Sequence, residues 1–382
     1  MPYGNMTPDQ LILAVDKKIT AVRTQSIDFS FNELADMHSA GELIIDPEFQ
    51  RMFRWPEGAR ARFIESLILE LPVPPIFLIE RDDRVYELID GLQRISSYLH
   101  FRGKLVIDGV DQGKLVLQDC DIVHELNGLR NDELPRALDI KLKRSYIRAE
   151  ILRKESDPRL RYHMFKRLNT GGEILSAQEV RNATIRLLSN DFNSLIIELS
   201  LTQDFVDSVS IISEPQRNRK FDQELVLRFF AYKNDIDSYK HDVEDFMTSY
   251  MERVSDPQIN DPFDYDAERA AFLKTFRVLN LAAKHLGIEG KVFGVTQVNR
   301  NPTSQFSVYH YEGLVIGLQA VLGRVDPDNG LHISALAEVI KSGKSDKEFL
   351  DQCGAGKNYR NPLLSRVNYF TRRFEEALDG CE

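Results

Sequence analysis

The sequence predicts an α+β protein, with a small mixed-sheet domain over residues 1–155 followed by a mostly α-helical domain over residues 156–382. Up to about residue 155, short apolar runs alternate with amphipathic segments of helical length. After Asp157 the strand pattern stops, and helical periodicity recurs from one segment to the next. A chain of 382 residues with 42% hydrophobic residues is long enough for two such cores.

Helix-start signals open the first domain. The stretches "TPDQ" at Thr7–Gln10 and "SFNE" at Ser30–Glu33 have the spacing of a capping box, and each predicts a helix. The stretch "GELIIDPEFQ" predicts a short apolar strand that ends at Pro47. In "PEGARARFIESLILELP" the apolar residues recur at helical spacing, and Pro72 stops the predicted helix.

The centre of the first domain is a predicted hairpin followed by a strand-to-helix turn. The strands "IFLIE" and "VYELI" flank the turn "RDDR". The chain then breaks at Gly91 and continues as a helix from Leu92, for which Gly103 is the predicted C-cap. A second hairpin is expected from "KLVI" and "KLVLQ" around "DGVDQG", and "IRAEIL" is the last predicted strand.

The second domain is predicted from successive helical patterns. A helix through "RLRYHMFKRL" ends at "NTGG", and Ser176 and Glu179 form a capping box for the next helix. Further amphipathic or apolar helices are expected in "FDQELVLRFFAYK", "ERAAFLKTFRVLNLAAKHLG", "YEGLVIGLQAVLG", "ISALAEVIKSG" and "LLSRVNYFTRRFEEALD".

The charge balance limits the partners of the protein. A net charge of -10 is the wrong sign for coating nucleic acid indiscriminately. The charge is uneven, because the stretch 141–167 holds ten Lys or Arg and three acids, and the segment "QRMFRWPEGARAR" forms a second basic cluster. These clusters are either solvated faces or the places where DNA docks. The DNA-binding candidates are Arg54, Arg60, Lys143 and Arg144.

No targeting signal is visible, and a cytoplasmic protein without membrane contact is expected. The N-terminus lacks a basic region followed by an apolar one, and "LILELPVPPIFLI" is too short and too interrupted to span a bilayer. Three widely spaced cysteines predict free thiols rather than disulfides or a structural zinc site.

The turn in "VYELIDGLQRISSYLHF" carries the strongest chemical signal. Gly91 leaves no side chain over the first turn of the following helix, whose N–H groups and dipole favour an anion. Arg94 is suited to a bidentate phosphate contact, and Asp90 to Mg²⁺ or to a nucleophilic water. Gln93 supplies a polar edge for a base, a ribose or a water. The alternative is structural: Asp90 caps the helix, and Arg94 pairs with a nearby acid.

Three stretches together resemble one family. The sequences "IDPEFQRMFRWPEGARARFIESLILELPVPPIFLIE", "YELIDGLQRISSYLHF" and "FKRLNTGGEILSAQEVRNA" are similar to the N-terminal domain of GmrSD-type restriction proteins, over about residues 25–190. The resemblance implies a ParB/sulfiredoxin-like fold and a D-G-Q-Q-R motif that binds and hydrolyses a nucleotide. This sequence departs from the motif at Leu92, where the family has its first glutamine.

Carried over by position, the resemblance implies a set of site residues. The implied catalytic residues are Asp90, Gln93 and Arg94, with Asp90 as the metal ligand. The implied nucleotide-binding residues are Gln50, Arg51, Gly91, Arg94 and Asn169. Asn169 lies in "RLNTGG", which is also explained as a helix C-terminus.

The sequence thus predicts a nucleotide-binding, DNA-associated protein of a restriction or phage-defence type. The expected cofactors are a nucleoside triphosphate of unspecified base and Mg²⁺. The C-terminal half shows no histidine and asparagine pattern of an HNH nuclease. DNA cleavage is therefore expected from a separate nuclease subunit, and self-association is left open. Two alternatives remain: a non-catalytic switch or assembly module that binds nucleotide or DNA, and a metal-dependent DNA nuclease in its own right.

Overall fold

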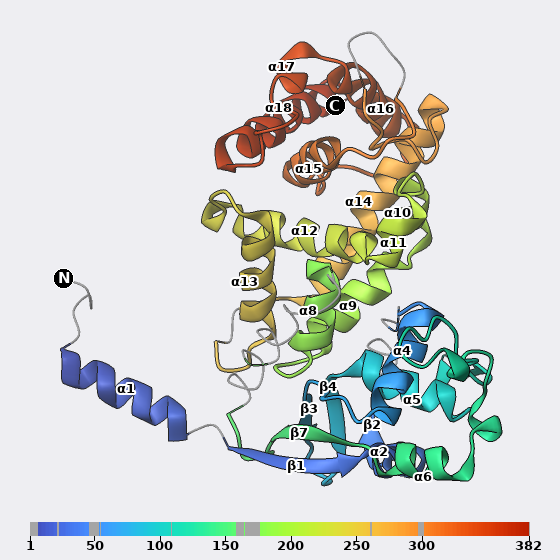
Figure 1. Ribbon diagram of the computed structural model, residues 1–382. Helices are drawn as coiled ribbons and strands as arrows, with labels where there is room; N and C mark the ends of the chain where they lie inside the picture. The colour runs from blue at the N-terminus through green and yellow to red at the C-terminus, as the bar shows by residue number, and fades with distance from the viewer. Residues whose placement is uncertain are drawn as a thin grey trace. The chain divides into compact units, whose positions relative to one another are not determined.

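The fold is that of an α+β protein with two compact units, Met1–Gly172 and Glu173–Glu382 (Figure 1). The computed structural model describes residues 7–20, 23–45, 53, 55–107, 109–157, 164, 176–259, 262–296 and 302–381. In this part of the chain the first unit holds a mixed five-stranded sheet with helices, and the second is mostly helical, which confirms the predicted class. The predicted domain limits, 1–155 and 156–382, stay a prediction, because the chain just after residue 157 is largely outside the described residues.

The sheet of the first unit has the strand order β1-β7-β3-β4-β2. The strands are β1 (Thr24–Ser30), β2 (Leu43–Ile44), β3 (Ile76–Glu80), β4 (Tyr86–Asp90) and β7 (Tyr146–Leu152). β1 and β7 are antiparallel, as are β3 and β4, whereas β7 with β3 and β4 with β2 are parallel. β3 is thus at the centre of the sheet, and β4 beside it ends at Asp90.

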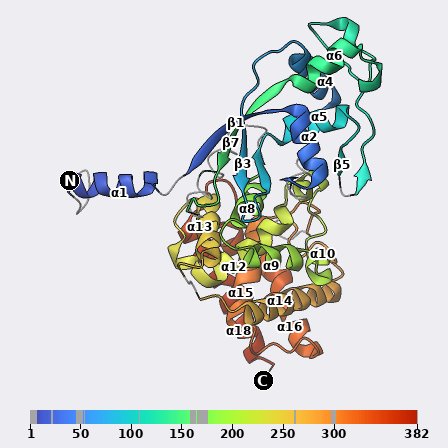
Figure 2. The ribbon, with the colours of Figure 1, turned by 90° about the horizontal axis from the view of Figure 1, so that it is seen from below.

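The helices of the first unit gather on one side of this sheet (Figures 1 and 2). They are α2 (Phe31–Ala40), α4 (Glu57–Ile68), α5 (Leu92–Phe101) and α6 (Arg136–Arg144), and α1 (Pro8–Thr20) precedes the sheet in the sequence. The first unit also has the 3-10 turns η1 (His124–Leu126) and η2 (Asn131–Glu133). Phe31 contacts the rings of Phe63 on α4 and Tyr98 on α5, so three helices meet in one aromatic core.

Most local predictions for the first unit are confirmed. The Glu33 N–H donates to Ser30 Oγ at 3.1 Å, and the Gln10 N–H donates to Thr7 Oγ1 at 3.3 Å. β3 and β4 form the expected hairpin. Arg102 is the C-cap of α5, and Gly103, predicted as the C-cap, follows it with φ +65°, in the left-handed conformation that ends a helix.

The second predicted hairpin is wrong in one arm. β5 (Val106–Ile107) pairs with β6 (Val110–Asp111), so the turn is tight and "KLVLQ" is not a strand. Leu115 and Leu117 are fully buried, and their N–H groups donate to the carbonyl oxygens of His100 and Leu129. Core packing and these irregular bonds override the apolar alternation.

The longest described elements of the first unit that were not predicted are β1 and α6. β1, "TQSIDFS", is mostly exposed, and its strand conformation comes from pairing along its whole length with β7. α6, "RALDIKLKR", buries only Leu142, and the sequence shows its charges more clearly than its apolar face.

The described helices of the second unit include all the segments predicted from residue 176 on, together with five helices that were not predicted. The helices are α8 (Ala177–Ile185), α9 (Asp191–Ser200), α10 (Gln203–Ser208), α11 (Glu214–Asn218), α12 (Phe221–Asp235), α13 (Val243–Ser255), α14 (Tyr265–Leu286), α15 (Val308–Gly317), α16 (Gly330–Lys344), α17 (Lys347–Leu350) and α18 (Arg360–Asp379), with the 3-10 turns η3 (Ile236–Ser238) and η4 (Leu318–Ala320). Those not predicted are α9, α10, α11, α13 and α17. The capping box of Ser176 and Glu179 is confirmed. The helix predicted through "RLRYHMFKRL" lies almost wholly outside the described residues.

The core of the second unit contains buried charges. Glu312 on α15 is 2% exposed and pairs with Arg366 at 2.6 Å and with Arg228 at 2.8 Å. Lys344, at the end of α16, is equally buried and donates to the carbonyl oxygens of Lys291 and Val292. Burial of this ammonium group lowers the pKa of Lys344 to about 7.

The first unit uses a buried carboxylate to hold a loop. Glu65 on α4 is 1% exposed, and its carboxylate accepts the N–H groups of Asp121, Ile122 and Val123. The shortest of these bonds, from the Val123 N–H, is 2.6 Å long. Because the loop has no strand partner here, this carboxylate takes the place of a neighbouring strand.

Replacing Glu65 by Ala is therefore expected to lower the free energy of unfolding by about 2–4 kcal/mol, because it leaves buried N–H groups without an acceptor. Chemical denaturation followed by circular dichroism measures this change. Glu70→Ala is the control, because the Glu70 side chain is 68% exposed and its ion pair with Lys141 is long, at 3.5 Å. Equal effects of the two substitutions would contradict the role of Glu65.

The lowered pKa of Lys344 predicts a pH dependence of stability. Between pH 7 and pH 10.5 the unfolded chain holds a proton on Lys344 that the folded chain lacks. The contribution of Lys344 to the free energy of unfolding therefore rises with pH in this window, by up to about 1.4 kcal/mol per unit. The denaturation midpoint, measured at several pH values, should rise less steeply with pH in Lys344→Met than in the unchanged protein. Lys341→Met on the same helix is the control, because Lys341 is 67% exposed and should keep the slope.

Candidate functional site

The candidate site is the turn between β4 and α5. Gly91 is the N-cap of α5 with φ +106°, a conformation that other residues rarely adopt, and no side chain caps the helix there. A Cβ atom on Gly91 would collide with Cγ2 of Ile76 at the start of β3. Glycine is thus required twice, by its backbone conformation and by the close approach of β3.

Arg94 connects the turn to the neighbouring strand. Its Nη2 donates to Asp90 Oδ2 at 2.8 Å, and its Nη1 donates to the carbonyl oxygen of Pro74 at 3.0 Å. The Arg94 side chain is 13% exposed and that of Asp90 is 36% exposed. The guanidinium therefore lies mostly under the surface, and the carboxylate forms the more accessible side of the pair.

The remaining residues of the motif also have internal roles. Leu92 is 5% exposed and belongs to the core. Gln93 Oε1 accepts the Trp55 N–H at 3.1 Å, which attaches the start of α4 to the start of α5. The carbonyl oxygen of Gln93 accepts a hydrogen bond from Ser97 Oγ.

Arg60, predicted to bind DNA, makes several internal contacts. Its Nε donates to the Trp55 carbonyl at 2.7 Å, and its guanidinium lies 4.1 Å from the centre of the Phe53 ring. Its Nη1 lies 3.2 Å from His100 Nδ1. Because arginine only donates, Nδ1 is the acceptor, and Nε2–H of the imidazole donates to the Gln112 carbonyl. Burial, with a smaller contribution from Arg60, lowers the pKa of His100 and keeps the ring neutral.

The other predicted site residues fall into two groups. Gln50, Arg51, Arg54 and Asn169 lie outside the described residues. Lys143 and Arg144 end α6; Lys143 pairs with Asp139 at 2.8 Å, and Arg144 is exposed. The structure thus brings Asp90, Gly91, Gln93 and Arg94 together in one turn.

The sequence did not reveal two partners of this turn, the Pro74 carbonyl and the Ile76 side chain. Their signal was weak: the stretch "PVPPI" lies directly before a predicted strand, and consecutive prolines expose carbonyl groups without offering N–H donors. Only the register of β3 against β4 shows that this stretch reaches the turn.

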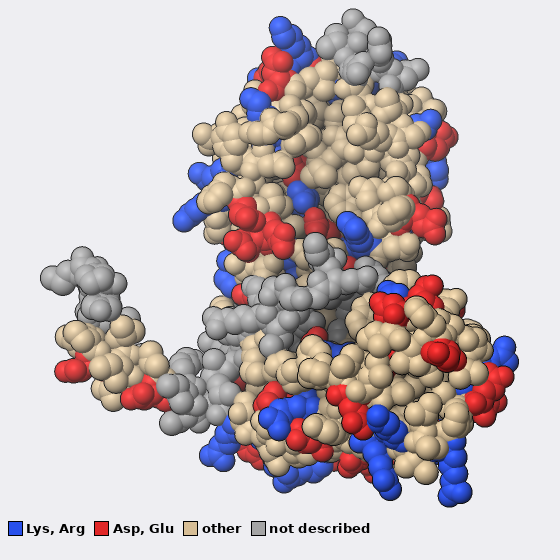
Figure 3. Space-filling view, viewed as in Figure 1, with Lys and Arg blue, Asp and Glu red and all other residues tan. Residues whose placement is uncertain are grey.

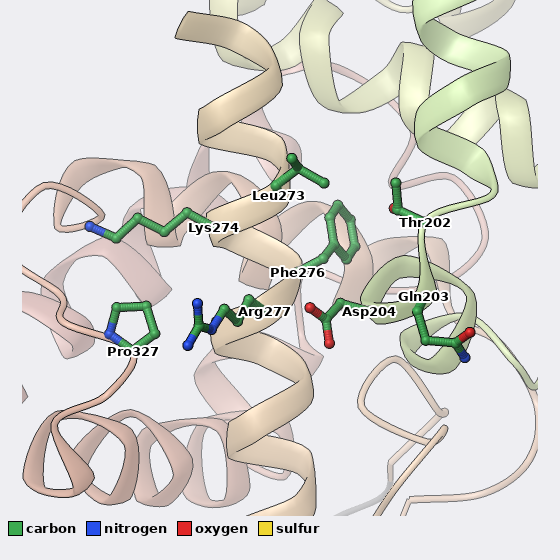
Figure 4. Close-up of a pocket in the computed structure, with 8 residues that line it drawn as sticks. All are labelled: Thr202, Gln203, Asp204, Leu273, Lys274, Phe276, Arg277 and Pro327. Atoms are coloured by element: carbon green, nitrogen blue, oxygen red, sulfur yellow. The ribbon is translucent and has the colours of Figure 1, made fainter. Parts of the chain in front are cut away.

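Apart from this turn in the first unit, the helical unit has a hollow of about 450 Å³ between α14, α10 and Pro327 (Figure 4). Phe276 and Leu273 supply its apolar surface. Several of its polar groups are already engaged: Asp204 accepts from Asn280, and Arg277 pairs with Asp328. None of the residues predicted from the sequence lines this hollow, so the turn at Gly91 remains the candidate.

The described residues contain no group of three or more His, Cys, Asp or Glu side chains that would hold a metal ion. The Asp90–Arg94 turn itself offers one carboxylate, that of Asp90. Mg²⁺ commonly binds through one or two carboxylates together with water and substrate phosphates, so Asp90 fits a nucleotide-dependent Mg²⁺ site. In the described part of the chain, no helix is long and apolar enough to cross a membrane.

The candidate site is thus a strand-to-helix turn in an α+β domain. A glycine lies at the end of the strand, an Asp–Arg pair spans the turn, and no side chain caps the start of the helix. Residues 31–186 match the family model of the GmrSD restriction endonuclease, N-terminal domain, and this part of the chain is such a domain. The match runs from the start of α2 to the end of α8. No curated protein and no solved structure gives a significant match.

The geometry at Gly91 predicts a large effect of a single methyl group. Gly91→Ala should lower the free energy of unfolding by more than about 2 kcal/mol, because it adds a collision with Ile76 to an unfavourable backbone conformation. Gly41→Ala is a matched control, with φ +76° and open space around the added Cβ, and should cost only about 1 kcal/mol.

A double substitution tests the collision directly by denaturant unfolding. In an Ile76→Ala background, which lacks Cγ2, Gly91→Ala should cost less than in the unchanged chain. Additive costs of the two substitutions would contradict close packing of Ile76 on Gly91.

Proposed function

We propose that the Asp90–Arg94 turn binds the phosphate groups of a nucleotide, in a protein of a DNA-restriction system. The observation that carries this proposal is the start of α5: no side chain caps the helix N-terminus at Gly91, and Arg94 is held beside it by Asp90. The helix dipole and the N–H groups of the first turn favour an anion at this position. The restriction context rests on the family of residues 31–186.

Each residue has a distinct role in this proposal. Arg94 and Arg51 hold phosphate oxygens, and Asp90 binds Mg²⁺ or orients the attacking water. Gln50, Gln93 and Asn169 complete the polar edge of the site. Phosphoryl transfer depends mainly on positioning and charge neutralisation, which arginines, a carboxylate and a helix N-terminus are able to provide.

A second candidate is a nucleotide-operated switch without hydrolysis. Two observations favour it over a hydrolase. Leu92, in the position where the family has a glutamine, is buried and contributes no polar group. Arg94 is already engaged with Asp90 and Pro74, so an arriving phosphate competes with internal bonds. In this form the energy of binding would rearrange the turn rather than drive cleavage.

The proposal also includes a partner, the DNA on which the restriction system acts. Basic residues of the first unit, among them Lys143 and Arg144, would meet its phosphates, and cleavage would be performed by a separate nuclease chain. Metal-dependent cleavage by this domain itself is the third candidate, and it would require Asp90.

Equilibrium binding of fluorescent ATP and GTP analogues, with and without Mg²⁺, tests the site. Asp90→Ala should weaken the Mg²⁺-dependent binding, and Arg94→Ala should weaken binding about 10- to 100-fold, as expected for a charged hydrogen bond. Arg81→Ala is the control, because Arg81 also pairs with a carboxylate, Glu87, at the opposite end of the hairpin.

Phosphate release in the same samples separates the candidates. Turnover that is lost in Asp90→Ala supports a hydrolase, whereas binding without turnover supports the switch. Thermal melting of each variant confirms that it is folded. Nucleotide binding that is unchanged in both Asp90→Ala and Arg94→Ala would overturn the proposed site.

A further inference from the structure

The first unit has a groove whose lining does not include the Asp90–Arg94 turn, with a volume of about 910 Å³. One wall is the segment Leu71–Pro75, which leads from α4 to β3, and the other is the face of α6 that carries Ala137, Ile140, Lys141 and Arg144. The start of β7, with Tyr146 and Arg148, and Asp28 of β1 complete the lining.

Apolar surface in this groove is unusually accessible. Tyr146 is 68% exposed and Leu71 is 42% exposed, and Pro72, Pro75 and Ile140 lie beside them. An exposed aromatic ring beside apolar walls offers a flat surface on which a planar group is able to stack.

The charges around the groove are compensated with one exception. Arg148 binds Asp28 with two hydrogen bonds, at 2.9 and 3.1 Å, and Lys141 lies 3.5 Å from Glu70. Arg144 is exposed and has no hydrogen-bond or ion-pair partner within the described ranges of the chain. The groove therefore carries one uncompensated positive charge, and no carboxylate on its lining is left unpaired there.

The surroundings are also basic. Figure 3 shows Lys and Arg side chains projecting along the edge of the first unit that β1 and α6 occupy in Figure 1. The carboxylates Asp139 and Asp36 on the neighbouring helices α6 and α2 pair with Lys143 and Lys104. Among the described residues, these lysines around the groove are therefore compensated by carboxylates, whereas Arg144 on its lining is not.

We infer that this groove binds a short single strand of DNA, with a base stacked on Tyr146 and a backbone phosphate on Arg144. Apolar walls, an exposed aromatic ring and a free arginine suit unstacked bases. One free cation is too little for the charge density of a duplex. The inference rests on the proposed association with DNA but is independent of nucleotide binding at Gly91. An acidic peptide is the competing occupant.

Fluorescence anisotropy with a fluorescein-labelled oligothymidylate of about 12 nucleotides tests the inference, at about 50 mM salt. Tyr146→Ala should weaken binding by about 5- to 100-fold, as expected for one lost stacking contact. Arg144→Gln should weaken binding and reduce the slope of log K against log salt by about 0.7, the contribution of one single-strand phosphate.

Tyr359→Ala is the matched control, because Tyr359 is another exposed tyrosine, 43% accessible, in the second unit. It should leave the affinity unchanged. A duplex of the same length and a Glu/Leu peptide labelled in the same way compete with the oligothymidylate. Tighter binding of either competitor, equal affinities of Tyr146→Ala and the unchanged protein, or absence of oligothymidylate binding would each overturn the inference.

Asp90→Ala separates this result from the proposed function. This variant should bind the oligothymidylate with unchanged affinity, since Asp90 does not line the groove. If the protein binds nucleotide but no oligothymidylate, only the proposal for the groove is overturned. If it binds oligothymidylate through Tyr146 but no nucleotide, only the proposal for the site at Gly91 is overturned.

Discussion

The arrangement of the first unit depends on one guanidinium. Arg94 donates to the carboxylate at the end of β4 and to the Pro74 carbonyl before β3, and its own backbone lies in the first turn of α5. Three segments are thus fixed relative to one another by a side chain that is 13% exposed. Gly91 reinforces the arrangement, since its lack of a Cβ lets Ile76 pack directly on the turn. The helix N-terminus is consequently held in place before any ligand arrives.

A turn held in this way has a consequence for binding. Every described side chain of the motif has an internal role: Leu92 fills the core, Gln93 accepts from Trp55, and Asp90 accepts from Arg94. These groups are already ordered, so binding a ligand would cost little of their side-chain conformational entropy. The ligand would also have to share them. A guanidinium has five N–H groups, and the bonds to Asp90 and Pro74 use two of these donors, so phosphate binding and the internal bonds are compatible only for some geometries.

Local sequence signals predicted the elements that local interactions determine. The caps at Ser30 and Ser176 and the helix after Gly91 depend on residues within one turn, and all three were predicted. β1 was missed because its strand conformation depends on β7, more than a hundred residues away in the sequence. The site was predicted in the same uneven way. Asp90 and Arg94 are four residues apart and were found together, whereas Pro74 and Ile76 reach the turn only through the pairing of β3 with β4.

The segment Leu71–Pro75 belongs to both proposed sites. Its Pro74 carbonyl accepts from Arg94, while Leu71, Pro72 and Pro75 line the groove. Because prolines lack N–H groups, such a segment is held mainly through carbonyl oxygens and side-chain packing. A phosphate that draws Arg94 away from Pro74 would loosen one wall of the groove, whereas a phosphate bound by the remaining N–H groups would leave that wall in place. Nucleotide and DNA strand would then affect each other's affinity equally in the first case and not at all in the second, since coupling between two binding sites is reciprocal.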